Sequence, residues 1–210
     1  MNIETLHGLV SPLYMEYNQV IKPLIAELEA REETSPQPLF NEVRALNDHI
    51  ARCYRANISD REIQDEIIKA QRHIKRLTLD CFKYLNVSLH ESIVRFERQT
   101  RNVDLTVINN GLFYPRFREL NKLAVEEVRN AKRAEAVDTE EALIKYQEGY
   151  NLYCELENLV DDNMQDVKWA KKKFVVRRSL TIFAWFVSVL ISGILSILVS
   201  CDFLRKLLLE

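Results

Sequence analysis

Two residues with the chemistry to act on a phosphate lie on one predicted helix. Arg44 and His49, with four residues between them, belong to the stretch Asn41–Tyr54. An imidazole exchanges a proton near neutral pH and a guanidinium stabilises phosphate charge, and Asp48 or Glu42 could orient such a pair. The alternative is structural, because Arg44 and Asp48 can form an i,i+4 ion pair and His49 can be a half-buried core residue.

The helix that carries the pair is amphipathic. Apolar residues alternate at spacings of four and three on one stripe, formed by Leu39, Val43, Leu46, Ile50 and Cys53. An arginine and a histidine in this arrangement, on an amphipathic helix of an all-helical chain, resemble the motif of the HEPN superfamily. The resemblance implies metal-independent RNA cleavage at a site shared between two protomers, with His49 moving the proton, Arg44 stabilising the transition state and Asp48 supporting the pair. Ala45 stands where many active members carry a polar residue, which favours a non-catalytic role.

The composition indicates one helical domain and a membrane segment. The chain has 210 residues, with 4 Gly, 5 Pro and a net charge of −2, so its bulk charge does not favour polyanions. Four cysteines, at 53, 81, 154 and 201, lack the short spacings of a zinc site or disulfide framework, and we expect reduced thiols, no metal and no cofactor. We expect an N-terminal bundle helix in residues 1–34, a HEPN-like bundle with a basic juxtamembrane end in 35–178, a transmembrane helix in 179–201 and a short tail in 202–210.

Capping and turn signals divide the soluble part into a bundle of five to six helices. The first helix is predicted to start at Ser11-Pro12 and to bend at Pro23, and residues 32–38 form a break. The other signals are a capping box at Ser59–Glu62, a second at Ser88–Glu91, a turn at Asn109–Gly111, a start at Pro115 and a cap at Asp138. No segment shows strand alternation, so the fold class is all-α.

Basic residues on two predicted helices form a candidate RNA-binding surface. They are Lys69, Arg72, Arg76, Arg95 and Arg98. Lysines and arginines at helical spacing can follow a phosphate backbone, although such a stripe is more often a solvated face. The apolar stripe Ile63, Ile67, Ala70, Ile74, Leu77, Cys81 and Tyr84 demands a partner helix, and His73 beside it is predicted to be structural.

The segment Ser179–Cys201 is predicted to cross a membrane. Its 23 residues carry no charge and, at ~1.5 Å per residue, cover the roughly 30 Å hydrocarbon core. Six basic residues precede it, namely Lys168, Lys171, Lys172, Lys173, Arg177 and Arg178. By the positive-inside rule, the N-terminal domain lies in the cytoplasm and the protein is a single-pass protein of the inner (cytoplasmic) membrane.

Small residues recur every four positions within this segment. Ser188, Ser192 and Ser196 share the pattern, and Gly193 sits beside Ser192. Three interpretations stay open: a packing seam between membrane helices, the lining of a pore, or serines bonded to their own helix backbone. The seam interpretation predicts a homo-oligomer.

The combination resembles membrane-anchored HEPN-like proteins of prokaryotic immunity. The resemblance implies an antiphage effector in contact with RNA, the lipid bilayer and an RNA-guided or other defence protein. The alternative is a non-catalytic HEPN-like protein that oligomerises and acts as a membrane pore or membrane-disrupting effector.

Overall fold

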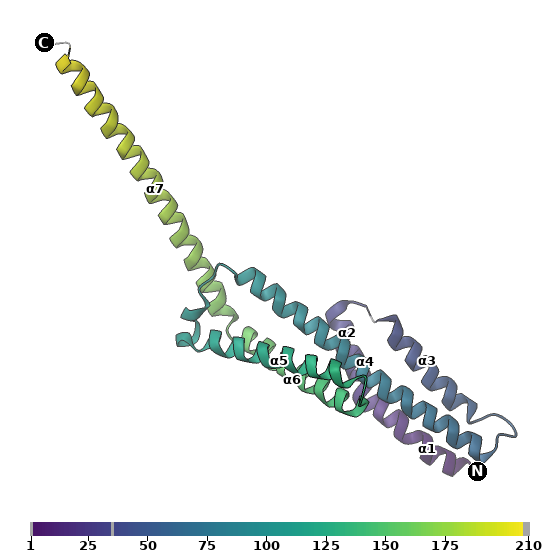
Figure 1. The fold of residues 1–210 in the computed structure, drawn as a ribbon. Coiled ribbons are helices and arrows are strands. Elements are labelled where there is room, and N and C mark those ends of the chain that lie inside the picture. The colour runs from purple at the N-terminus through teal and green to yellow at the C-terminus, as the bar shows by residue number, and fades with distance from the viewer. Residues whose placement is uncertain (1, 35, 208–210) are drawn as a thin grey trace. The chain divides into compact units, whose positions relative to one another are not determined.

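The protein is built from helices. The computed structural model describes residues 2–34 and 36–207, and side chains except those of 177, 178 and 198–207. The described residues form the helices α1 (Ile3–Glu16), α2 (Lys22–Glu32), α3 (Gln37–Arg52), α4 (Asp60–Thr100), α5 (Phe113–Ala134), α6 (Thr139–Asp162) and α7 (Met164–Leu207), with a π-helical segment η1 (Tyr17–Ile21) and a 3₁₀ segment η2 (Leu105–Gly111) (Figure 1). Six helices thus precede the apolar one, which confirms the all-α prediction.

The chain divides into two compact units. The first consists of Met1–Arg98 and Pro115–Asp161, and the second of Gln99–Tyr114 and Asp162–Glu210. The first unit therefore holds α1–α3, nearly all of α4, and α5 and α6. The second holds η2 and α7, where Ile108, Val167 and Ala170 are buried.

Helix α1 begins at Ile3, nine residues earlier than the Ser11-Pro12 signal predicts. The Asn2 side chain caps it by accepting a hydrogen bond from the Thr5 amide at 2.8 Å. Pro12 lies inside the helix, where it removes one backbone donor. Burial of apolar residues on both sides of Pro12 offsets that loss, since Leu6, Val10 and Leu13 are all buried.

Just before Pro23, where a bend is predicted, the chain forms a π-helical turn. In η1 the amide of Lys22 donates to the carbonyl of Tyr17, five residues back, immediately before Pro23. A π turn holds more residues than an α turn and changes which side chain faces the core. Ile21 is accordingly fully buried, whereas its neighbour Val20 is 39% exposed.

Helix α4 is the longest element of the first unit and its start was correctly predicted. The Ser59 amide donates to Glu62 Oε2 at 2.8 Å, and the Glu62 amide donates back to Ser59 Oγ at 3.3 Å. The predicted new start at Ser88 is wrong, because the apolar stripe continues through Leu85 and Leu89, both fully buried. Ser88 is itself buried within the uninterrupted helix.

The stripe predicted on α4 forms the centre of the core. Its members pack with α1, α2 and α3 in one cluster: Ile63, Ile67, Ala70, Ile74, Leu77 and Cys81, with Tyr84 partly buried against them. A second cluster joins α4 to α5 and α6 through Leu79, Phe82, Ala131, Ala142 and Tyr146. Helix α4 thus contributes to both clusters, which explains its regular heptads.

The later boundary signals were largely correct. Asn109 and Asn110 adopt left-handed φ values of 47° and 52° at the predicted turn. Asp138 Oδ1 accepts hydrogen bonds from the Glu140 and Glu141 amides. Helix α5 starts at Phe113, two residues before the predicted Pro115.

Helix α7 is long and apolar enough to cross a membrane. In the candidate span Met164–Ile197, none of the most apolar 18-residue window is buried. The predicted segment 179–201 falls within this helix, and its side chains from 198 onward lie outside the described ones.

Candidate functional site

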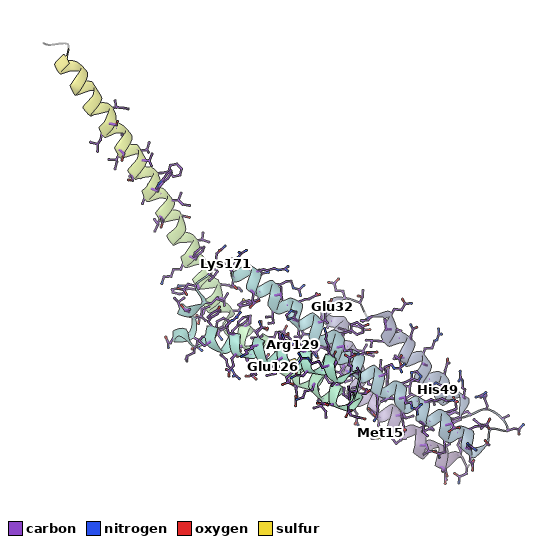
Figure 2. All side chains as sticks on the ribbon, viewed as in Figure 1. Met15, Glu32, His49, Glu126, Arg129 and Lys171 are labelled. Carbon is purple, nitrogen blue, oxygen red and sulfur yellow. The ribbon has the colours of Figure 1, made fainter. Side chains whose placement is uncertain are left out.

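The candidate site lies where α3 packs beside α4 in the first unit (Figure 1). His49, on α3 (labelled in Figure 2), places Nδ1 2.7 Å from Oε2 of Glu66 on α4. Glu66 is only 7% exposed, and its other oxygen accepts from Lys69 Nζ at 2.6 Å. Arg52 Nη1 lies 3.7 Å from Glu66 as well, so one buried carboxylate is surrounded by three basic groups.

A second histidine–glutamate pair lies beside the first. In this pair the histidine belongs to α4 and the glutamate to α3. His73, on α4, places Nδ1 2.7 Å from Oε2 of Glu42 on α3. Arg76 Nη1 approaches the other oxygen of Glu42 at 3.4 Å. Both histidines are largely covered, since the side chains of His49 and His73 are 15% and 21% exposed.

The two imidazoles stack on each other. Their ring centroids are 5.1 Å apart, and the planes are inclined by 22°. On each helix the glutamate precedes the histidine by seven positions, which is two helical turns and therefore one face. Because α3 and α4 are successive helices joined by a short connection, each glutamate meets the histidine of the other helix.

Glu66 determines which nitrogen of the His49 ring carries the hydrogen. The hydrogen bond from His49, followed by that from Lys69, lowers the pKa of Glu66 to about 2, so this carboxylate is ionised at neutral pH. An ionised carboxylate only accepts, and Nδ1 of His49 must therefore carry the hydrogen. In the neutral ring Nε2 is then the basic nitrogen, as in carboxylate-oriented catalytic histidines.

The structure brings some of the sequence-predicted residues together and separates others. His49, Lys69 and Arg76 belong to the His–Glu cluster of Glu42, His49, Glu66 and His73 with its basic neighbours. Arg44 and Asp48 are exposed, and five residues turn a helix by about 140°, so Arg44 and His49 point in different directions within one chain. Their predicted catalytic roles stay predictions.

The remaining predicted RNA-binding residues are spread along α4. Arg72 is exposed one residue before His73. Arg95 and Arg98 are exposed more than twenty residues further along the helix, which corresponds to at least about 30 Å. They cannot contact the same phosphate as the cluster, and their RNA contacts stay predictions.

Sequence reasoning missed Glu66 and Arg52, and assigned His73 a structural role. A signal was present: Glu42 and His49 repeat the seven-residue spacing of Glu66 and His73. The hydrogen bond of Glu42 was also unexpected, because Glu42 contacts His73 instead of His49.

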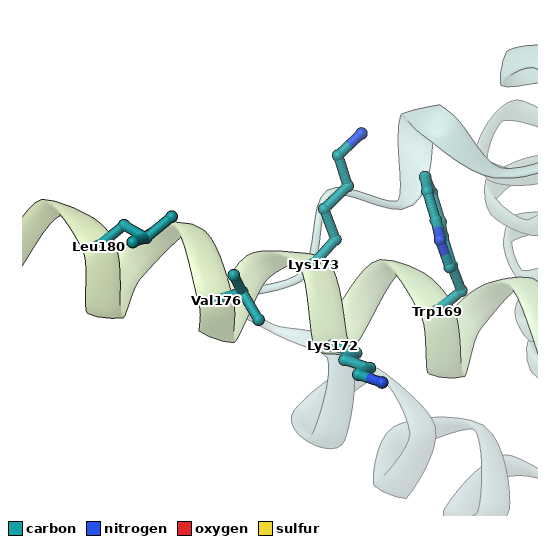
Figure 3. Close-up of a pocket in the computed structure, with 5 residues that line it drawn as sticks. All are labelled: Trp169, Lys172, Lys173, Val176 and Leu180. Atoms are coloured by element: carbon teal, nitrogen blue, oxygen red, sulfur yellow. The ribbon is translucent and has the colours of Figure 1, made fainter.

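The predicted membrane seam lies on α7, in the second unit. Ser188, Ser192, Gly193 and Ser196 are all exposed, and a Cβ added at Gly193 would meet nothing within 4 Å. At the basic end of the helix, Lys173 Nζ lies 4.7 Å from the Trp169 ring centroid, on the same side of α7, while Lys172 projects from the other side (Figure 3). A lysine and a tryptophan next to an apolar segment are typical of a membrane interface.

Comparisons of the chain with protein-family models, curated proteins and solved structures find no match. Among the described residues, no group of three or more His, Cys, Asp or Glu side chains is arranged to hold a metal ion.

Proposed function

We propose that the protein is a membrane-tethered, HEPN-like effector of prokaryotic defence that cleaves RNA without a metal. The observation that carries this proposal is the pair of stacked imidazoles, each oriented by a carboxylate. General acid–base cleavage of RNA needs one group to remove a proton and another to supply one. Two adjacent histidines can be in opposite protonation states near neutral pH.

The proposed reaction uses the 2′-hydroxyl of RNA as the nucleophile. One neutral imidazole accepts the 2′-hydroxyl proton, the 2′-oxygen bonds to phosphorus and the 5′-oxygen leaves with a proton from the other, protonated imidazole. The products are a 2′,3′-cyclic phosphate and a 5′-hydroxyl. Arg52, Lys69 and Arg76 supply positive charge beside the pair for the phosphate oxygens.

In this proposal, Arg44 would act at the histidines of a second protomer. Its side chain is exposed and directed away from His49 of its own chain. The HEPN resemblance implies a site shared between protomers, in which Arg44 of one copy would reach the histidines of the other. Such a homo-oligomer would form through the helical bundle, and α7 would tether it at the inner face of the cytoplasmic membrane, where RNA and an RNA-guided or other defence protein are encountered.

Cleavage of a single-stranded RNA labelled at both ends, by full-length protein in detergent with EDTA present, tests the proposal. His49→Ala and His73→Ala should each reduce the rate by roughly 10²–10⁴-fold, the usual contribution of a general acid or base. The exposed His7 provides the matched control, because His7→Ala should cleave like the wild type. Arg44→Ala should lose cleavage and regain it when mixed with a His49→Ala protomer.

The product ends and the folded fraction separate catalysis from stability. A 2′,3′-cyclic phosphate is expected, and the rate should fall on both sides of a pH optimum. If cleavage by the two histidine variants follows only their folded fraction, measured by circular dichroism, the cluster is a structural contact and the proposal is wrong. A requirement for added divalent metal would likewise contradict it.

One observation favours the second candidate, a non-catalytic membrane effector. No residue of the most apolar window of α7 is buried, although small residues that permit close helix packing lie within this helix. Loss of membrane potential that survives His49→Ala would support this second function.

A further inference from the structure

A groove of about 480 Å³ follows α7 in the second unit, where the basic residues of this helix give way to its apolar segment (Figure 3). Trp169, Lys173, Val176 and Leu180 line it at spacings of four, three and four, which place them on one stripe of the helix, and Lys172 borders this stripe. One end of the groove is therefore cationic and aromatic, whereas the other end is apolar. None of these residues belongs to the first unit, which holds the His–Glu cluster.

The lysines at the cationic end lack acidic partners. Residues 167–178 contain six lysines and arginines and no aspartate or glutamate. Among the described side chains, none of Lys171, Lys172 and Lys173 forms an ion pair. Lys83 of the first unit, by comparison, lies 2.8 Å from a carboxylate oxygen of Glu135. The charge of the α7 lysines therefore favours an anion from outside the chain.

The position of the groove along α7 matches the boundary of a bilayer. The uncharged segment begins at Ser179, six residues or about 9 Å beyond Lys173. Polar headgroups occupy roughly 5–8 Å on each side of the hydrocarbon core, and a long lysine side chain extends the reach of its charge towards that layer. Leu180, in contrast, lies within the uncharged segment and is 63% exposed. With α7 across a membrane, the cationic end would face headgroups and the apolar end would face acyl chains.

Trp169 gives the cationic end a defined shape. Val167 and Ala170 near it on the helix are buried, so α7 is packed at this level, whereas Trp169 itself is 53% exposed. Lys173 Nζ lies 4.7 Å from the centroid of the indole ring, within the range of a cation–π contact. An indole offers one N–H donor and a large apolar surface, a combination that is enriched at membrane interfaces. The ammonium group and the indole can therefore hold a phosphate and cover the apolar groups beside it.

We propose that this groove binds an anionic phospholipid of the bilayer in preference to a zwitterionic one. The lipid phosphate would lie at Lys173 and Lys172, the glycerol beside Trp169, and one acyl chain along Val176 and Leu180. A zwitterionic headgroup carries a cation that the lysines would repel, whereas the charge of an anionic lipid is uncompensated. This site rests on the membrane tether of the proposed function and does not depend on RNA cleavage.

Fluorescence quenching of full-length protein in nanodiscs tests the site. Trp185→Phe leaves Trp169 as the only tryptophan, and the bilayer contains equal parts of phosphatidylglycerol and phosphatidylcholine, one of them brominated on its acyl chains. Brominated phosphatidylglycerol should quench Trp169 at least twofold more strongly than brominated phosphatidylcholine, and Lys173→Gln should remove this difference. Lys171→Gln is the matched control, because it removes the same charge from an exposed position about 200° around the helix from Trp169, and the difference should persist.

Four results would overturn the proposal. Equal quenching by the two lipids would show that the groove has no lipid preference, although the membrane tether would stand. Equal effects of Lys171→Gln and Lys173→Gln would reveal diffuse surface charge instead of a site. Loss of the difference in millimolar inorganic phosphate would reveal a plain anion site. Absence of quenching by either lipid would contradict the membrane tether itself, so failure of the site and failure of the tether give different results.

Discussion

His49 of α3 and His73 of α4 stack with their ring centroids 5.1 Å apart, and each ring is held through Nδ1 by a glutamate of the opposite helix. Two adjacent protonated imidazoles would repel each other. Each ring instead faces a carboxylate, so the four side chains form one contact that joins α3 to α4. In the proposed function, the same arrangement would hold the two rings for proton transfer.

The buried Glu66 predicts a loss of stability in acid. Its pKa is lowered from 4.5 to about 2, mainly by the hydrogen bond from His49. A carboxylate with a lowered pKa stabilises the folded state above pH 4.5, and this stabilisation is lost as the pH falls from 4.5 towards 2. Glu66→Gln should lower the free energy of unfolding at pH 7 by on the order of 2 kcal/mol and flatten its pH dependence in that window.

Denaturant unfolding at several pH values between 2.5 and 7 measures this effect. The matched control is Asp65→Asn, at the exposed position next to Glu66 on α4. It should leave the slope between pH 4.5 and 2.5 nearly unchanged. An identical pH dependence of wild type and Glu66→Gln would show that the His49–Glu66 contact does not stabilise the fold.

Gly149 on α6 permits a close approach of three helices. A Cβ at this position would lie 2.9 Å from Val128 Cγ2 on α5 and 3.0 Å from Asn86 Oδ1 on α4. Gly149→Ala should therefore reduce stability by about 1–3 kcal/mol, the usual cost of overpacking. Gly8→Ala is the control, because a Cβ there meets nothing within 4 Å and should stabilise α1 by roughly 0.5–1 kcal/mol. The melting temperature should therefore fall for Gly149→Ala and rise for Gly8→Ala.

The basic residues before the apolar part of α7 predict its orientation. In bacterial spheroplasts treated with external protease, a C-terminal tag should be cleaved and an N-terminal tag protected. Replacing Lys168, Lys171, Lys172 and Lys173 by Gln should weaken this bias and yield molecules of mixed orientation. Protection of both tags in the wild type would contradict a single span.

The small residues of α7 predict self-association. Replacing Ser188, Ser192 and Ser196 together by Leu keeps the segment apolar, so membrane insertion should persist. Each lost interhelical hydrogen bond is worth ~0.6 kcal/mol, at most about 2, and worse packing adds to the loss. The oligomer in detergent should weaken by tenfold or more.

The cellular readout of this triple variant distinguishes the two proposed functions. RNA cleavage through a bundle dimer should persist, whereas dye-reported depolarisation by a membrane effector should vanish. Replacing Val189, Ile191 and Ile194 by Leu is the control. These changes nearly conserve side-chain volume, so they should leave the oligomer unchanged. If the serine variant retains its oligomeric state and its cellular effect, the serines have no role in assembly.

Local signals in the sequence predicted much of the fold. The Ser59–Glu62 box and the Asp138 cap depend on side chains within three residues of the backbone groups that they bind, so the pattern alone reveals them. The signals at Pro12 and Ser88 misled for one reason. The free energy gained by burying a continuous apolar stripe outweighs the local effect of one proline or one capping residue, so the helix continues through both positions.

The candidate site was only half predictable. The amphipathic helix placed His49 near the core, but its partner depended on how α3 lies along α4, which no local pattern encodes. The seven-residue spacing shared by Glu42–His49 and Glu66–His73 becomes meaningful only once the two helices are known to pair. The hydrogen bond from Asn86 to the Tyr146 carbonyl was unpredictable for the same reason, because it depends on how α4 packs against α6.

Helix α4 carries both Glu66 of the His–Glu cluster and the buried Asn86, about 30 Å apart along one axis. Its 41 residues include neither glycine nor proline, so no hinge interrupts the helix between them. A tilt or axial rotation imposed at Asn86 would therefore be transmitted mechanically to His73. The separation of the two imidazoles would then depend on how α4 packs against α6 at Asn86, where the Asn86 amide donates to the Tyr146 carbonyl.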